Sequence, residues 1–236
     1  MTKMSHRPVV RKMAGLALLA GLWLGGTATA CGQALTQPAD ATRSDPPTIT
    51  YRRVFEGSTP EFVEIAVRQD GAAKADVRQL SEAASPEEFA VRPAFRTQIF
   101  DLARQLRNFQ GADLDVRRRV AYMGQKTFRW DHGAETYQAQ YNYTVDPKAT
   151  QLQKMFENLA LEQGDLITLE QRSRYDRLGI NQAIDQFEQH LNQGLLPEPE
   201  RFLTVLDRIA EDTRLIELAR KRARSLAARI RVGQSQ

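Results

Sequence analysis

The segment ETYQAQYNYT, residues 135–144, indicates the fold class, because its apolar and polar side chains alternate without interruption. Successive side chains of a β-strand point to opposite faces of the sheet. The apolar face would carry Tyr137, Ala139, Tyr141 and Tyr143, and the opposite face only Thr, Gln and Asn residues. Such alternation is typical of an antiparallel strand with one buried face.

Four further segments are predicted as strands from their β-branched and aromatic residues or from the turn signals beside them. Gln69-Asp70-Gly71 and Asp131-His132-Gly133 are the two hairpin signals. The expected strands cover residues 49–55, 62–68, 75–80, 127–130 and 135–144.

Two helices are predicted between and after these strands. Pro93 opens a segment in which apolar residues recur every three or four positions as far as Phe109. Asp146-Pro147 combines an N-cap with a first-turn proline before a second such segment. Residues 48–163 are therefore predicted to form an α+β domain. Its antiparallel sheet would have about five strands with packed helices, in ββαββα-like order after the first strand.

Residues 164–232 contain no strand signal, and their apolar stripes have helical spacing. We expect an all-helical C-terminal region of three or four helices joined by short turns. The pattern leaves open whether this region is a separate subdomain or a cover of the sheet.

Residues 1–30 have the three-part layout of an export signal. Residues 1–12 carry four basic groups and no acidic group, and residues 13–26 are uncharged and mostly apolar. The box Ala28-Thr29-Ala30-Cys31 resembles the cleavage site of a bacterial lipoprotein signal, which implies that Cys31 is lipidated and becomes the first mature residue. The same box also fits ordinary signal peptidase. Residues 31–47 are polar and contain three prolines, a composition typical of a flexible tether.

Cys31 is the only cysteine of the chain, so no intramolecular disulfide can form. Its position at the cleavage site therefore favours lipid attachment over free secretion. Gly32 after it, where Asp would indicate inner-membrane retention, marginally favours the outer membrane. We expect a lipid-anchored protein of the cell envelope, with a secreted or soluble periplasmic protein as the alternative.

The charge balance excludes one class of partner. Without the four basic residues of the signal, the chain has 29 basic and 29 acidic residues and is formally neutral. A globally basic nucleic-acid-binding protein is therefore excluded, and no nucleic-acid partner is expected.

The sequence contains no assembled catalytic or metal-binding motif. His132 and His190 lie in no zinc-ligand spacing, so neither a metal nor another cofactor is expected. Asp131 and His132 would supply acid–base chemistry if they lay in a cleft, which gives an envelope hydrolase that needs no metal as an alternative function. A turn position for this pair, and a surface or boundary position for His190, is the simpler interpretation.

Aromatic side chains on the apolar face of the sheet form the candidate ligand-binding surface: Trp130, Tyr137, Tyr141 and Tyr143. Such rings stack on sugars or peptides when a sheet face is open. The competing interpretation is that they form the core beneath the helices.

Basic residues near the C-terminus form a second candidate surface: Arg220, Lys221, Arg222 and Arg224, with no acidic residue after Glu217. They are candidates for contact with anionic phospholipid or an acidic partner. A solvated helix face that complements the helix dipole is the alternative.

These observations predict a non-enzymatic envelope lipoprotein that acts as an interaction or assembly module, anchored to the membrane through Cys31 and bound to another envelope protein. The alternatives are an envelope hydrolase and a glycan- or peptide-binding module that uses the aromatic sheet face.

Overall fold

A computed structural model describes residues 45–233. The expected export signal, Cys31 and all but the last three residues of the expected tether lie outside the described residues. Between residues 45 and 233 the chain forms six strands and five α-helices. The predicted α+β class is confirmed.

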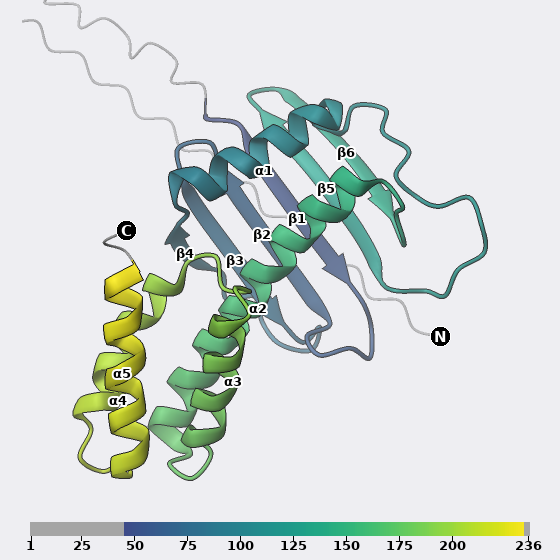
Figure 1. Cartoon of the computed structure of the whole chain (residues 1–236). Coiled ribbons are helices and arrows are strands. Elements are labelled where there is room, and N and C mark those ends of the chain that lie inside the picture. The colour runs from purple at the N-terminus through teal and green to yellow at the C-terminus, as the bar shows by residue number, and fades with distance from the viewer. Residues whose placement is uncertain (1–44, 234–236) are drawn as a thin grey trace, which may run out of the picture. The chain divides into compact units, whose positions relative to one another are not determined.

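The sheet is antiparallel throughout, with the strand order β4-β3-β2-β1-β5-β6 (Figure 1). Its strands are β1 (Thr48–Val54), β2 (Phe62–Arg68), β3 (Ala72–Arg78), β4 (Glu87–Ala90), β5 (Gln125–His132) and β6 (Glu135–Tyr141). Tyr51 on β1 lies opposite Ile65 on β2 and Phe128 on β5. Because directly opposed residues share a face, these three buried side chains form one row across the middle of the sheet.

Strand β4 is the element that the sequence pattern did not predict. It has four residues, EEFA, and pairs only with β3 at the edge of the sheet. Only Phe89 in it is half-buried. A short, charged strand of this kind is how proteins protect a sheet edge from further pairing, and it leaves almost no alternation to recognise.

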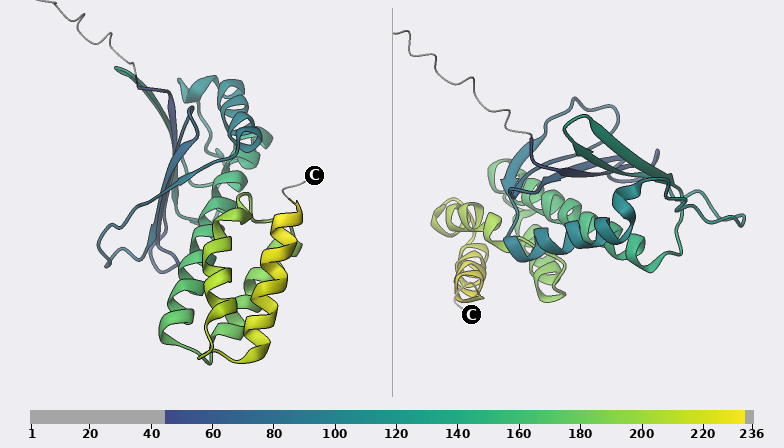
Figure 2. Two further views of the ribbon diagram at one scale, coloured as in Figure 1. Left: turned by 90° about the vertical axis from the view of Figure 1, so that its left-hand side faces the viewer. Right: turned by 90° about the horizontal axis from the view of Figure 1, so that it is seen from above.

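Helices α1 (Pro93–Gln105) and α2 (Pro147–Tyr175) lie on the same face of the sheet, as the edge-on view shows (Figure 2). Asp146 caps α2 as predicted, because its carboxylate accepts hydrogen bonds from the backbone N–H groups of Lys148 and Ala149. The other face of the sheet is polar and carries exposed ion pairs such as Arg52–Glu64. The face of the sheet that α1 and α2 cover therefore forms the hydrophobic core.

Aromatic rings fill the centre of this core. Phe128 is fully buried and lies 5.2 Å from the ring of Phe109, 5.4 Å from Tyr51, 5.5 Å from Tyr141 and 6.3 Å from Phe156, measured between ring centroids. These rings come from three strands, α2 and the turn after α1. The cluster joins β1, β5 and β6 to α2 and to the turn after α1.

Helix α2 is long enough to serve two hydrophobic cores. Leu152 and Leu159 near its start pack into the core of the sheet, whereas Leu169 packs into a second core. The second core is formed by α3 (Ile180–Asn192), α4 (Leu203–Glu211), α5 (Glu217–Gly233) and the short helix η2 (Pro199–Phe202). Helices α3 and α4 thus pack on the C-terminal half of α2, and α5 packs on α3 and α4.

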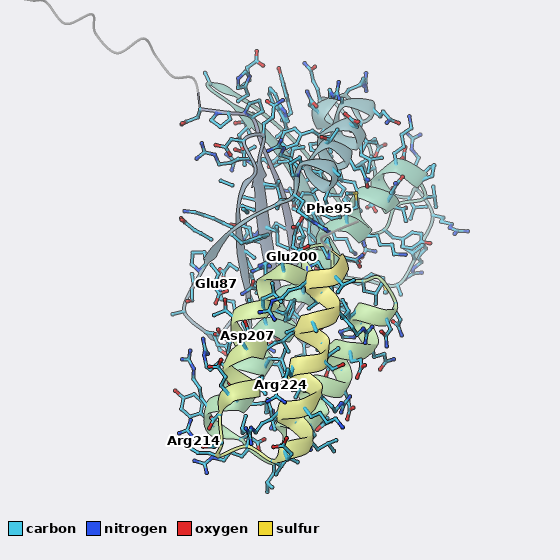
Figure 3. All side chains as sticks on the ribbon, turned by 60° about the vertical axis from the view of Figure 1, so that its left-hand side comes forward. Glu87, Phe95, Glu200, Asp207, Arg214 and Arg224 are labelled. Carbon is cyan, nitrogen blue, oxygen red and sulfur yellow. The ribbon has the colours of Figure 1, made fainter. Side chains whose placement is uncertain are left out.

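A buried ionic network joins these two cores. Glu162 on α2 is fully buried, forms an ion pair with Arg201 (2.9 Å) and accepts a hydrogen bond from the backbone N–H of Glu198 (2.7 Å). Glu198 in turn forms an ion pair with Arg92 at the start of α1 (3.2 Å). Arg201 also stacks on Phe89 of β4. Figure 3 shows this region from the side, with Glu87 and Glu200 labelled.

Candidate functional site

The four aromatic residues predicted to form a ligand-binding face differ in burial in the structure. Trp130 is only 9% exposed and stacks on the half-buried Tyr137, with ring centroids 5.7 Å apart. Tyr141 is buried in the aromatic core, and its hydroxyl donates to Gln153 on α2 (3.2 Å). The helices thus cover most of the aromatic face.

Tyr143 does not share the face predicted for it. Strand β6 ends at Tyr141, and Tyr143 is 42% exposed. The Asp115 carboxylate accepts hydrogen bonds from the backbone N–H groups of Asn142 and Tyr143, both 3.1 Å. This contact with a distant loop turns the chain away from the sheet, and the local alternation gives no sign of it.

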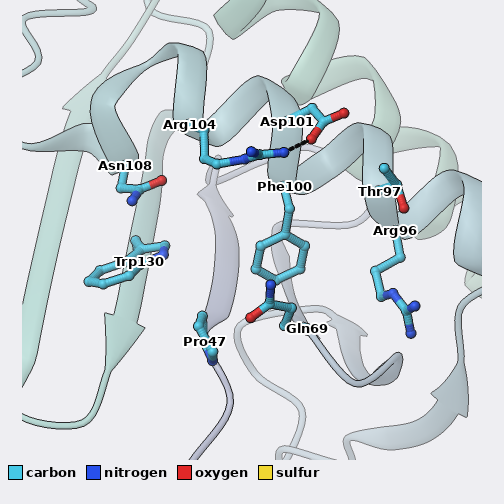
Figure 4. Close-up of a pocket in the computed structure, with 9 residues that line it drawn as sticks. All are labelled: Pro47, Gln69, Arg96, Thr97, Phe100, Asp101, Arg104, Asn108 and Trp130. Carbon is cyan, nitrogen blue, oxygen red and sulfur yellow. Dashed lines mark hydrogen bonds and ion pairs between the residues drawn. The ribbon is translucent and has the colours of Figure 1, made fainter.

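A groove of about 430 Å³ lies beside Trp130, between α1 and one end of the sheet (Figure 4). Its lining combines two guanidinium groups, two aromatic rings and two side-chain amides. The lining residues are Pro47, Gln69, Arg96, Thr97, Phe100, Asp101, Arg104, Asn108 and Trp130. In the view of Figure 4, Phe100 stands between Trp130 and Arg96. Trp130 is the one predicted residue that reaches this groove.

The groove has a net positive charge. Arg104 forms an ion pair with Asp101 one turn earlier on α1. Arg96 forms no ion pair with any carboxylate between residues 45 and 233, and its guanidinium lies against the backbone of Gly71. An arginine free to form two parallel hydrogen bonds, placed next to aromatic rings, is suited to a ligand that carries a carboxylate.

One wall of the groove is a strained turn. Arg107, Asn108 and Phe109 have φ angles of 55°, 50° and 67°, and none of them is glycine. Such left-handed backbone costs about 1–2 kcal/mol per residue with a side chain. The buried ring of Phe109, stacked on Phe128, holds the turn, and Asn108 is thereby presented to the groove. Strain of this kind clusters at functional sites.

Replacement of Arg107 by glycine is expected to raise the free energy of unfolding by about 0.5–1 kcal/mol. Glycine adopts left-handed backbone without the steric cost that a side chain imposes. Part of this gain is lost, because glycine also increases the conformational entropy of the unfolded chain. Urea unfolding measures the change. Gln105→Gly, in the last turn of α1, should instead lower stability by about 1 kcal/mol. Equal losses in both variants would contradict strain at Arg107.

Most basic residues of the predicted C-terminal surface form ion pairs or hydrogen bonds with other residues of the chain. Arg222 forms ion pairs with Asp185 (2.5 Å) and Glu188 (2.8 Å) on α3. Arg220 pairs with Glu217, and both Arg220 and Arg224 donate hydrogen bonds to the carbonyl of Ala210. Lys221 is exposed. Except for the Arg220–Glu217 pair within α5, these contacts tie α5 to α3 and α4, and the sequence could not reveal them because the partners lie on those helices.

The Asp131–His132 pair lies at the end of β5 and not in a cleft. Asp131 accepts hydrogen bonds from Arg129 and from the hydroxyl of Thr136. His132 is exposed next to the hairpin turn, with its ring edge-on to Trp130 at 5.6 Å. The turn itself is formed by Gly133 and Ala134, so the predicted turn position of the pair is wrong: both residues are the last two of β5 and pair with Thr136 and Glu135 of β6.

The sequence interpretation missed a buried pair that involves the other histidine. His190 Nδ1 on α3 lies 2.6 Å from a carboxylate oxygen of Asp165 on α2, and both side chains are largely buried. Burial raises the pKa of Asp165, while the contact with His190 opposes that rise. Within residues 45–233 the hydrogen bonds of His190 include no serine or threonine hydroxyl, so the pair is not extended there to a nucleophile.

Asp165 also reaches a second cavity, of about 400 Å³, between α2 and the sheet. Tyr51, Arg53 and Glu157 line the same cavity. The hydroxyl of Tyr51 donates to Glu157 (3.0 Å), and burial raises the pKa of that hydroxyl. Tyr51 and Glu157 bind each other, and Asp165 binds Gln186 and His190, whereas Arg53 donates to the carbonyl of Pro60 and its buried Nε has no hydrogen-bond partner among the described residues. We regard the groove beside Trp130 as the stronger candidate site because its Arg96 forms no ion pair with another of residues 45–233.

Two observations on the structure and two comparisons with known proteins complete the description. Within residues 45–233, no group of three or more histidine, cysteine, aspartate or glutamate side chains is arranged to hold a metal ion. The helices of that part of the chain include none with the length and apolar character required to cross a membrane. The chain matches no protein-family model and no curated protein.

Proposed function

We propose that the protein is a non-enzymatic binding module of the bacterial cell envelope, anchored through a lipidated Cys31, whose groove beside Trp130 binds an acidic peptide segment of an envelope partner. The observation that carries this proposal is the position of Arg96, which has no carboxylate partner in the described chain, in a groove lined by Phe100 and Trp130.

The chemistry of the lining supports an acidic peptide. Guanidinium groups bind carboxylates by paired, charge-assisted hydrogen bonds, and the amides of Gln69 and Asn108 can both donate to and accept from a peptide backbone. Phe100 and Trp130 supply flat apolar surface for side chains on either side of the acidic group. A groove with these parts suits recognition of an acidic peptide.

The position of the groove also supports an anchored module. Pro47, one residue before β1, lines the groove. The N-terminal segment therefore leaves the described body next to the binding site. An anchor at Cys31 would keep the groove within reach of partners held at the same membrane.

Fluorescence of Trp130 gives a direct test. In a Trp23→Phe variant Trp130 is the only tryptophan, because the chain has two. A peptide with two glutamates between two phenylalanines should change its emission saturably, and Arg96→Gln should weaken the Kd about tenfold, the value of one charge-assisted hydrogen bond. The affinity should fall with added salt.

Two controls make the test specific. Arg118→Gln removes the same charge from an exposed arginine of the loop before β5, outside the groove lining, and it should leave the Kd unchanged. The same peptide with glutamines should bind at least tenfold more weakly. Equal binding of both peptides, or an unchanged Kd in Arg96→Gln, would contradict the proposal.

A further inference from the structure

Four large apolar side chains are exposed on two turns of the helical region. Tyr175, the last residue of α2, and Leu178, in the turn between α2 and α3, are 83% and 91% exposed. Ile216 and Leu218, where the α4–α5 turn enters α5, are 48% and 58% exposed. We call these four residues, with the turns that carry them, the distal tip.

The two turns lie side by side at one end of the helices, as both views of the ribbon show (Figures 1 and 2). Electrostatics agrees with this arrangement. Hydrogen bonds from Arg214 are the main cause that lowers the pKa of Asp212 to about 2, and the charge of Arg177 from the neighbouring turn contributes to this lowering. Arg214 is labelled at this end in Figure 3. The exposed apolar side chains therefore belong to one surface.

Neighbouring residues fix the turns in this conformation. Ile180 and Leu215, each within two residues of an exposed apolar side chain, are buried in the helical core. The Asp176 carboxylate accepts a hydrogen bond from the backbone N–H of Gly179 (2.9 Å), and Asp212 accepts one from the backbone N–H of Arg214 (3.0 Å). Leu178 and Ile216 are thus held outward by a rigid support.

The segments that form the distal tip contain more basic than acidic residues. Residues 172–179 and 211–221 together contain six basic and four acidic residues, so the surface has an excess of positive charge. Asp176 pairs with Arg172, and Asp212 pairs with Arg214. Arg174 and Lys221 are exposed, and neither forms an ion pair with another of residues 45–233.

We propose that the distal tip docks on the surface of an anionic lipid membrane, with Tyr175, Leu178, Ile216 and Leu218 inserted at the headgroup level and the arginines of these segments and Lys221 bound to lipid phosphates. Apolar side chains projecting from a rigid support, with basic groups in the same segments, are the features by which proteins bind the membrane interface without spanning it. A second copy of the chain would bring like charges together, so charge complementarity favours lipid over self-association.

This surface is independent of the groove beside Trp130 and of the anchor at Cys31. Docking of the distal tip would bring the folded body itself into contact with the membrane. The test must therefore report on the distal tip locally, because residues 13–26 are apolar and could bind vesicles on their own.

Hydrogen–deuterium exchange of the full chain provides that local measurement. Vesicles of phosphatidylcholine with one third phosphatidylglycerol should slow exchange in residues 172–179 and 212–218 severalfold, and vesicles of phosphatidylcholine alone should leave it unchanged. The double variant Leu178→Ser/Ile216→Ser should lose this protection, since burial of one leucine changes a partition coefficient by at least about tenfold.

The matched control is Val145→Ser, which removes an apolar side chain that is 65% exposed just before α2, and it should retain the protection. Three outcomes would overturn the proposal: unchanged exchange at the distal tip although the chain binds vesicles, equal protection by neutral vesicles, or protection that appears without vesicles as protein concentration rises. The last outcome would assign the surface to a second copy of the chain.

Discussion

Replacement of Arg201 by methionine is expected to lower the free energy of unfolding by about 3 kcal/mol at pH 8. Arg201 supplies the only cation in direct contact with Glu162 among the described residues, and the Glu162 side chain is fully buried. Without Arg201 the carboxylate must either stay charged in an apolar setting or bind a proton, and both cost free energy. Methionine keeps an apolar contact with Phe89, so the loss reports mainly on the charge.

The effect should depend on pH. Burial raises the pKa of Glu162 from its ordinary value to about 7, although the hydrogen bond from Glu198 and the charge of Arg201 oppose the rise. A raised pKa means that the native state holds the proton more tightly than the unfolded chain. The proton bound by Glu162 therefore stabilises the folded protein fully below about pH 4.5. This contribution is lost as the pH rises through 7, and the free energy of unfolding falls by about 3 kcal/mol in total.

Urea unfolding at several pH values, followed by circular dichroism, measures both effects. Arg201→Met should cost less at pH 5, where Glu162 is protonated, than at pH 8. The control Glu162→Gln keeps the shape of the side chain and should flatten the pH dependence between 4.5 and 7. If Arg201→Met lowers the free energy of unfolding equally at both pH values, the loss does not arise from the ionised carboxylate of Glu162.

Replacement of Phe128 by alanine is expected to destabilise the protein by about 3–5 kcal/mol. Phe128 is fully buried, and four other aromatic rings lie within 6.3 Å of it between centroids. The cavity left by the ring would be bordered by three strands, α2 and the strained turn at Phe109, which cannot all move inward together. Loss of aromatic pair contacts adds to the cost.

Thermal and urea unfolding give the size of this effect, and Tyr175→Ala provides the matched control. Tyr175 is 83% exposed, so its truncation should change stability by less than about 0.5 kcal/mol. If Phe128→Ala unfolds within 1 kcal/mol of the wild type, the aromatic cluster does not hold the sheet to the helices.

Several elements could be predicted because their signals are local. The strand β6 follows from alternation within seven residues, and α2 starts at Asp146-Pro147 because both cap and first-turn proline act on the adjacent backbone. The groove could not be predicted in this way. Trp130 was recognised as a candidate, but Arg96 and Phe100 reach it only because α1 crosses the end of the sheet.

The amino-acid sequence by itself determined the α+β class, the positions of most strands and helices, and which face of β6 is apolar, since these depend on periodicity and capping among near neighbours. Tertiary structure alone decided which polar residues meet. Glu162 and Arg201 are 39 residues apart, and Asp165 and His190 are 25 apart, on helices whose packing brings them together. It also decided that Tyr141 is buried while Leu178 is exposed, because burial depends on which distant element covers a side chain.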